Sequence, residues 1–242
     1  MKGYITKLQV SLGQDFGSQM LLYASMISIC KKTGLTPIFV KELIKERYGF
    51  PLNEPFNHKA TLVSLEDMSN DVLYSIEAEH SVENHIDKRL FYLENNKNYN
   101  IVNELFSYKY FHDIKEDILD IYTFNDSIKN FCLSYINNIK NQDEILVSIH
   151  FRRGDYLQVS SLNLSLEYYY AAVDYIKSKF PNNKIKFLIF SNGMEWVKEN
   201  FKPDNCMYVE GLDRFKDMCL MTMCNHNIIA KDRKSTRLNS SH

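Results

Sequence analysis

The stretch from Glu144 to Leu157 constrains the fold most, because it joins an apolar run directly to a cluster of charged residues. The run Ile145–Ile149 has the length and composition of a buried strand, which is typical of a parallel sheet. Open α/β sheets bind their ligands at the carboxyl ends of the strands. The polar residues that follow the run are therefore candidates for a binding site: His150, Arg152, Arg153 and Asp155.

The two adjacent arginines, Arg152 and Arg153, have no acidic run beside them that would neutralise both, so they indicate an anionic ligand. A guanidinium group binds phosphate oxygens through paired N–H groups, which makes a phosphate the first candidate. The alternative is a surface turn in which arginine pairs with Asp155, and this stretch alone favours neither interpretation. Gly154 permits the sharp turn in both cases. We interpret the tripeptide Arg-Gly-Asp at 153–155 as a coincidence, since it follows a buried strand.

Predicted strands and helices alternate along the chain, which is the pattern of parallel, doubly wound sheets. In the first half, strands at Tyr4–Val10 and Ile38–Val40 flank a glycine-containing loop and a helix that runs to about Thr33. In the second half, strands are predicted at 145–151, 187–191, 206–209 and 227–230, and helices at 165–179, 194–201 and 215–224. We therefore predict two Rossmann-like α/β domains that face each other across a cleft, at residues 1–140 and 141–230.

The middle of the first half shows fewer patterns. Residues 50–56 contain two prolines and are predicted to form a loop, and residues 77–94 are strongly charged, which is typical of an exposed segment. The asparagine-rich run 95–100 is predicted to form a turn. Apolar residues recur at helical spacing over 114–124 and 128–139, so we expect two helices to close the first domain.

Charge and cysteine content argue against several classes of protein. The chain has 29 basic and 30 acidic residues, so non-specific nucleic-acid binding is not indicated and any positive potential must be local. Its five cysteines form no Cys-x-x-Cys pair, which is typical of reduced cysteines in an intracellular protein. The sequence shows neither a signal peptide nor an apolar stretch of membrane-spanning length. We expect a cytoplasmic protein, either soluble or bound peripherally to the inner face of a membrane.

Residues 231–242 break the alternating pattern. They carry four cationic side chains and a single large apolar one, Leu238, and such a composition cannot bury a core. We interpret this segment as disordered or foreign. On that interpretation the second domain is truncated at residue 230.

Five short blocks of the sequence together carry a family resemblance. They are Gly17-Ser-Gln-Met-Leu-Leu-Tyr-Ala24, Phe106-Ser-Tyr-Lys-Tyr-Phe111, His150-Phe-Arg-Arg-Gly-Asp-Tyr156, Phe190-Ser-Asn-Gly-Met-Glu-Trp196 and Leu220-Met-Thr-Met-Cys-Asn-His-Asn-Ile-Ile-Ala230. In this order they resemble blocks of the α-1,2-fucosyltransferases of glycosyltransferase family 11, whose arginine motif is His-x-Arg-Arg-x-Asp-Tyr. The resemblance covers about residues 4–230. Asn192 and Gly193 stand where that family has an acidic pair, and Lys231 stands where it continues with Asn-Ser-Ser-Phe-Ser-Trp-Trp.

The resemblance implies a GT-B architecture and inverting transfer of fucose from GDP-fucose to the 2-hydroxyl of a galactoside, in a glycan such as an O-antigen or capsule. Negative charge then grows on the β-phosphate of the leaving GDP, and fixed cations or a metal must stabilise it. No Asp-x-Asp motif occurs, so we expect no metal and no cofactor, with GDP-fucose as a co-substrate. Arg152, on the pyrophosphate, and Asp155 are the catalytic candidates. The residues expected to bind GDP-fucose are His150, Arg152, Arg153, Asp155, Gly17, Gln19 and Ser191.

The remaining roles are expectations of the same kind. Arg153 is expected to orient the loop by pairing with Asp155 or a neighbour, and Trp196 and His226 are expected to pack in the structure rather than bind. The first domain is expected to hold the acceptor, and no residue is assigned as the base. Two alternatives stay open: another nucleotide-sugar transferase, because an arginine on a diphosphate does not select fucose, and a non-catalytic GDP-sugar-binding fragment.

Overall fold

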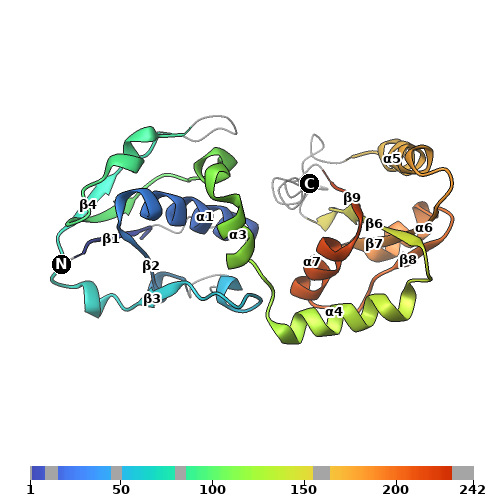
Figure 1. Cartoon of the computed structure of the whole chain (residues 1–242), viewed down its shortest axis with the longest axis horizontal. Helices are drawn as coiled ribbons and strands as arrows, with labels where there is room; N and C mark the ends of the chain where they lie inside the picture. The colour runs from blue at the N-terminus through green and yellow to red at the C-terminus, as the bar shows by residue number, and fades with distance from the viewer. Residues whose placement is uncertain (1, 9–15, 45–50, 80–85, 155–163, 231–242) are drawn as a thin grey trace. The chain divides into compact units, whose positions relative to one another are not determined.

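The chain folds into two compact units, the first ending at Asn125 and the second starting at Asp126. A computed structural model describes residues 2–8, 16–44, 51–79, 86–154 and 164–230. Each unit contains one parallel β-sheet with helices beside it, which confirms the predicted α/β class (Figure 1). The sequence placed the division near residue 140. It falls earlier because helix α4 (Asp126–Ile139) packs on helix α7 (Arg214–Met223) of the second unit.

The first unit is built on a five-stranded sheet in the order β3-β2-β1-β5-β4, in which all neighbours are parallel. The strands are β1 (Tyr4–Thr6), β2 (Thr36–Val40), β3 (Thr61–Val63), β4 (Leu73–Ile76) and β5 (Asn98–Ile101). The α-helices are α1 (Phe16–Thr33), α2 (Lys41–Ile44) and α3 (Lys115–Ile121). Short 3-10 helices are η1 (Pro51–Asn53), η2 (Glu66–Met68), η3 (Lys88–Tyr92), η4 (Tyr108–Tyr110) and η5 (His112–Ile114).

Helix α1 is buried around most of its surface, because β2 and the short helices η1, η3 and η4 all contact it. This explains why small and apolar residues fill nearly every position of its middle turns. A helix that is apolar on all sides is typical of the centre of a packed layer. The first block of the family resemblance, Gly17–Ala24, is thus the first half of a core helix.

In the run 95–100, residues 95–97 form the predicted turn, but residues 98–100 belong to strand β5, so the prediction was wrong for that half. Strand β5 pairs with both β1 and β4, which supplies its backbone hydrogen bonds despite its polar sequence. Asn100 is buried there because its side chain accepts a bond from Leu8 N at 2.8 Å and donates one to Ser75 Oγ at 3.4 Å. Because a polar side chain can be buried when it is hydrogen-bonded in this way, a search for apolar residues does not identify such a strand.

The charged stretch 77–94 is likewise not simply exposed in its described part. Leu90 is fully buried, and so is Asp87. The Asp87 carboxylate accepts bonds from the Arg89 guanidinium, at 2.9 and 2.6 Å. These bonds, outweighing the effect of burial, hold the pKa of Asp87 below its ordinary value. The buried carboxylate of this charged stretch thus has a cationic partner, as a buried charge requires.

The second unit is built on a four-stranded parallel sheet in the order β8-β7-β6-β9. Its strands are β6 (Glu144–Phe151), β7 (Lys184–Ser191), β8 (Cys206–Tyr208) and β9 (His226–Ile228). Its helices are α4 and α7 together with α5 (Leu166–Lys179) and α6 (Met194–Asn200). These elements confirm the strands and helices predicted for 145–230, with bounds that differ by up to three residues.

One face of this sheet forms the core beneath α5 and α6. Val147, Ile149 and Phe151 alternate along β6 and pack with Val173 of α5 and Val197 of α6. Alternate residues of a strand point to one face, so the other residues of β6 point away from this core. The core thus fixes the position at which β6 ends.

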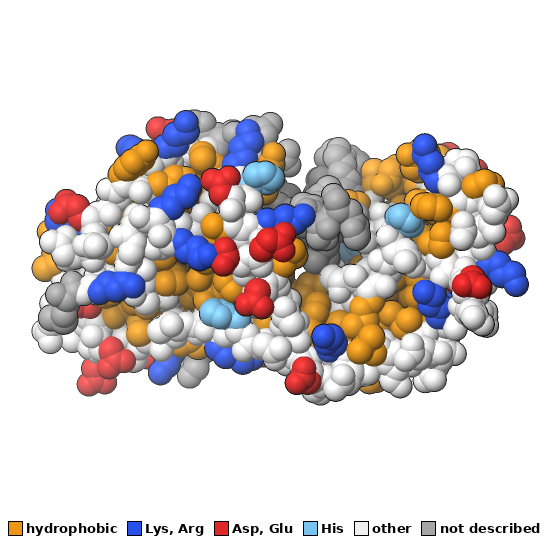
Figure 2. All heavy atoms as spheres, viewed as in Figure 1, with side chains coloured by type: hydrophobic (Ala, Val, Ile, Leu, Met, Phe, Trp, Pro, Cys, Tyr) orange, Lys and Arg blue, Asp and Glu red, His pale blue; other side chains and the backbone are white. Residues whose placement is uncertain are grey.

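The surface agrees with the balanced composition of the chain. Figure 2 shows acidic and basic side chains interspersed over the visible face of the first unit. Among the described residues, no helix combines the length and the hydropathy needed to cross a bilayer.

Candidate functional site

The turns that follow β6 and β7 carry most of the predicted site residues. In the register of the two strands, His150 is opposite Phe190 and Phe151 is opposite Ser191, so the strands end side by side. Arg152 and Arg153 follow β6 directly. The structure therefore brings four predicted residues to one edge of the sheet: His150, Arg152, Arg153 and Ser191.

The other three predicted residues lie elsewhere or outside the described part of the chain. Gly17 and Gln19 belong to the first unit, in the first turns of α1, where Gly17 is half-buried and Gln19 is buried. Asp155 lies outside the described residues, so its predicted pairing with Arg153 and its catalytic role stay predictions.

The guanidinium group of Arg153 lies over the indole of Trp196, with its Cζ atom 3.3 Å from the ring centroid. Among the described residues, no carboxylate lies within ion-pair distance of it. Burial lowers the pKa of Arg153, although a guanidinium stays charged in proteins. The edge of the sheet thus carries the half-buried positive charge of Arg153. One face of the guanidinium is covered by Trp196, and its N–H groups lie around the edge of the guanidinium plane.

The turn after β6 and the turn after β7 are in direct contact. Arg153 N donates to Asn192 Oδ1 at 2.7 Å. A Cβ on Gly193 would lie 3.2 Å from the Arg153 Cβ, and one on Gly154 would lie 2.5 Å from the Asn192 Nδ2. A side chain at position 154 would therefore displace the Asn192 amide, whereas one at position 193 would press on the stem of Arg153. The Asn-Gly pair that replaces the acidic pair of the family resemblance is part of this contact.

Helix α5 supports the same strand end from the side. The Tyr169 ring stacks on Phe151 with centroids 3.8 Å apart, and its hydroxyl donates to the His150 carbonyl at 3.3 Å. Burial raises the pKa of the Tyr169 hydroxyl, so it remains a protonated donor. At the end of β7, Ser191 Oγ accepts a bond from Gly193 N at 3.0 Å.

His226 and Trp196 were both predicted to pack rather than bind, and their contacts differ from each other. His226 stacks on Phe180 with centroids 4.7 Å apart and lies in register with Val147, away from the end of β6, which confirms a packing role. Trp196 packs against the core as predicted, but it is also the platform for Arg153, which the sequence interpretation missed. One signal was present, since Trp196 is the single tryptophan and follows the end of β7 as the arginines follow the end of β6.

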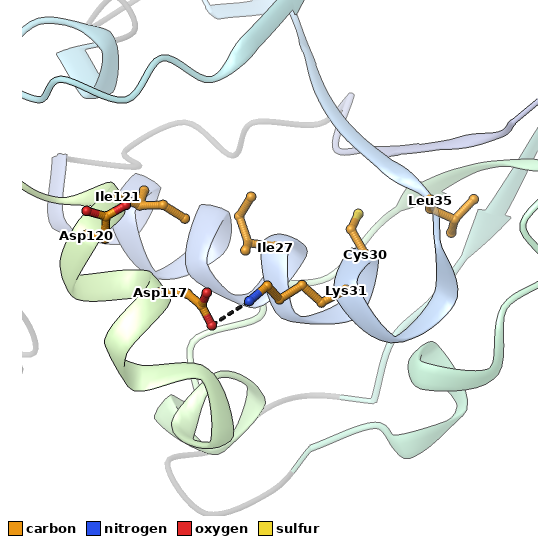
Figure 3. A pocket seen from close by; sticks show the side chains of 7 residues that line it. All are labelled: Ile27, Cys30, Lys31, Leu35, Asp117, Asp120 and Ile121. Carbon is orange, nitrogen blue, oxygen red and sulfur yellow. Dashed lines mark ion pairs between the residues drawn. The ribbon is translucent and has the colours of Figure 1, made fainter.

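A shallow pocket of about 340 Å³ lies in the first unit between α1 and α3, and none of the predicted site residues lines it. Figure 3 shows the ion pair at this pocket, in which Lys31 Nζ lies 2.5 Å from Asp117 Oδ2, together with the apolar lining residues Ile27 and Ile121. Because Asp117 neutralises Lys31, this pocket offers no surplus positive charge. In the described part of the chain, no three His, Cys, Asp or Glu side chains are grouped as metal ligands would be.

The sequence is similar to known fucosyltransferases. The model of the family described as Glycosyl transferase family 11 matches residues 1–235. Galactoside alpha-(1,2)-fucosyltransferase 1 of Leontopithecus chrysomelas is 30% identical over 138 residues, and that of Leontocebus fuscicollis has the same identity over the same length. Each alignment covers 51% of this chain and 37% of the relative, so the chain spans much less than the full length of these relatives.

Solved structures show the same fold. A NodZ alpha-1,6-fucosyltransferase soaked with GDP-fucose has a TM-score of 0.61 at 11% identity, covering 95% of this chain and 88% of that one. POFUT1 in complex with GDP-fucose has a TM-score of 0.59 at 9% identity, covering 98% and 93%. At such identities the likeness establishes the fold, the GT-B type, and fold alone does not assign a substrate. The family model, which spans nearly all of the sequence, decides the assignment: the chain belongs to glycosyl transferase family 11.

Proposed function

We propose that this chain transfers fucose from GDP-fucose to the 2-hydroxyl of a galactoside in a glycan, with inversion and without a metal. The observation that carries the proposal is the pair of arginines, Arg152 and Arg153, at the end of β6. The guanidinium of Arg153 stacks on Trp196 at the edge of a parallel sheet. Membership of the family and similarity to relatives named galactoside alpha-(1,2)-fucosyltransferase 1 support it.

The chemistry needs positive charge at this position. When the bond between fucose and GDP breaks, charge develops on the β-phosphate, and a cation fixed in advance stabilises that charge more than it stabilises the ground state. Arg152 is our first choice for this contact, and the stack on Trp196 makes Arg153 a second donor. A charge-assisted hydrogen bond of this kind contributes about 1.5–3 kcal/mol.

The binding part of the proposal is tested by the GDP affinity of Arg152→Ala, measured by titration calorimetry. We expect a loss of about tenfold to a hundredfold, from the size of one charge-assisted bond. Arg214→Ala is the matched control, because Arg214 is an exposed arginine of the same unit that also lies near an aromatic ring, Phe215. Equal GDP affinities for the wild type and Arg152→Ala would contradict the proposed role.

The catalytic part is tested by incubating the chain with radiolabelled GDP-fucose and a β-galactoside, with and without chelator, and assigning the product linkage by NMR. We expect an α-1,2-linked product formed at the same rate with chelator. Binding of GDP without any transfer would instead support the non-catalytic alternative. Preference for a different nucleotide sugar would support another transferase.

A further inference from the structure

The side chain of Arg153 is positioned by residues from the neighbouring strand end. Asn192 holds its backbone N–H at 2.7 Å, Gly193 leaves the space that its aliphatic stem occupies, and Trp196 lies under its guanidinium. All three residues follow β7, whereas Arg153 follows β6. The position of Arg153 therefore depends on residues that do not belong to the arginine motif.

The stack on Trp196 restricts Arg153 in a specific way. Arginine has a long side chain with many rotamers, and binding an anion normally requires ordering it. Trp196 is itself fixed, because it packs against the core under α6. A guanidinium lying flat on a fixed ring keeps its plane, while its N–H groups stay along the rim where they can donate to an anion.

We infer that Trp196 is a positioning residue for the diphosphate of the donor: it acts through Arg153, holding the guanidinium plane in the orientation in which it donates to phosphate oxygens. This inference rests on the proposed function, since it takes GDP as the ligand. The alternative is that the stack only stabilises the second unit. The two differ in what the removal of the ring does to GDP binding.

The first test compares Trp196→Leu and Trp196→Phe with the wild type by calorimetric titration with GDP. We expect Trp196→Leu to lower GDP affinity by about threefold to thirtyfold, the range of a cation–π contact, and Trp196→Phe to lower it less because a ring remains. Phe180→Leu is the control, since Phe180 packs against the same core and stacks on His226 rather than on an arginine. It should lower the Tm without changing GDP affinity.

A double-mutant cycle separates positioning from general stabilisation. Arg153→Lys keeps the charge and loses the plane, so it should weaken GDP binding by itself. If Trp196 acts through Arg153, adding Trp196→Leu to Arg153→Lys should change the affinity little further. Fully additive losses would overturn the inference. The cycle can be run with Trp196→Phe if Trp196→Leu does not fold.

Fluorescence gives a readout of the stack that does not depend on any ligand. Trp196 is the only tryptophan in the chain, so all tryptophan emission comes from this position. Arg153→Ala should change the emission of the unliganded protein because the guanidinium leaves the ring, and an unchanged spectrum would contradict the stack. If the wild type fails to bind GDP, the proposed function fails. If it binds GDP and Trp196→Leu binds equally well, only the positioning role fails.

Discussion

Asp217, on α7, carries a carboxyl group whose surroundings disfavour its charge. Its Oδ1 atom is buried and makes no hydrogen bond to any described residue. Burial, and then the charge of Asp213, raise the pKa of Asp217 from 3.8 to about 6. The folded state therefore binds this proton more tightly than the unfolded chain does. Its contribution to stability is full below pH 3.8 and is lost as pH rises to about 6.

We expect Asp217→Asn to raise the free energy of unfolding by roughly 2 kcal/mol at pH 8, because the amide has no charge to bury and each pKa unit corresponds to about 1.4 kcal/mol. At pH 4.5 the gain should be much smaller, since Asp217 is then mostly protonated in the folded state. Urea unfolding at the two pH values measures both. Asp174→Asn, at an exposed position of α5, is the control and should change little at either pH. An equal gain at both pH values would rule out titration of Asp217 as the cause.

At the scale of single residues, the sequence could predict which side chains lie at the ends of β6 and β7, but not the contacts that position them. Of the other predicted residues, Gly17 and Gln19 lie in the first unit, and Asp155 is outside the described residues. Arg152, Arg153 and Ser191 follow from the strand ends alone, because register brings the ends of neighbouring parallel strands together. The stack of Arg153 on Trp196 joins residues from two different turns, and no local pattern encodes such a contact. The buried Asn100 was missed for a similar reason, since its partners Leu8 and Ser75 are distant in sequence.

Among the helices, α7 has a defined start. Asp213 Oδ1 accepts bonds from Phe215 N at 2.9 Å and Lys216 N at 3.0 Å, and its Oδ2 lies 2.7 Å from Lys216 Nζ. Burial opposes the charge of Asp213, but these bonds outweigh it and lower the pKa of Asp213. Because the same charge raises the pKa of Asp217, the start of α7 and the buried carboxyl are coupled.

Asp213→Ala should lower the free energy of unfolding by about 1 kcal/mol at pH 7, the usual effect of losing a helix cap. Asp213→Asn keeps the capping oxygen and removes the charge, so it should be clearly more stable than Asp213→Ala. In both variants the pKa of Asp217 should move back toward its ordinary value, which NMR titration of the carboxyl carbon can follow. If Asn and Ala destabilise equally, the cap is not what Asp213 contributes.

At the scale of secondary structure, predictability followed length and composition. Strands β6 and β7 are eight residues each and largely apolar, so their sequence identifies them. Strands β3, β4 and β5 have three or four residues and include exposed or polar positions, so they resemble loops until the sheet pairs them. Their conformation comes from tertiary hydrogen bonds rather than local preference.

For the whole chain, hydrogen exchange can locate GDP without assuming which unit binds it. With saturating GDP, we expect slower exchange in peptides that cover residues 150–154 and 190–196, because these turns carry the arginines and their supports. Peptides from α4 should not change and serve as the internal control. Protection confined to the first unit would contradict the assignment of the donor site to the end of β6.

The alternation of strands and helices was enough to predict two α/β halves, but it was not enough to predict the residue at which they divide. The spacing of apolar residues over 128–139 predicts a helix but not the sheet on which that helix packs. The structure shows α4 against α7, where Cys132 Sγ donates to the Lys216 carbonyl at 3.6 Å. The predicted cleft between the halves stays a prediction.

The support of Arg153 by residues beyond β7 has a consequence for biosynthesis. Asn192 is 39 residues later in the chain than Arg153. At about 5–20 residues per second, a ribosome makes Asn192 roughly two to eight seconds after Arg153. During that interval the nascent chain contains Arg152 and Arg153. It does not yet contain the Asn192 amide or the Trp196 indole, which position Arg153. If the donor binds as proposed, its full affinity requires α6 to have been made.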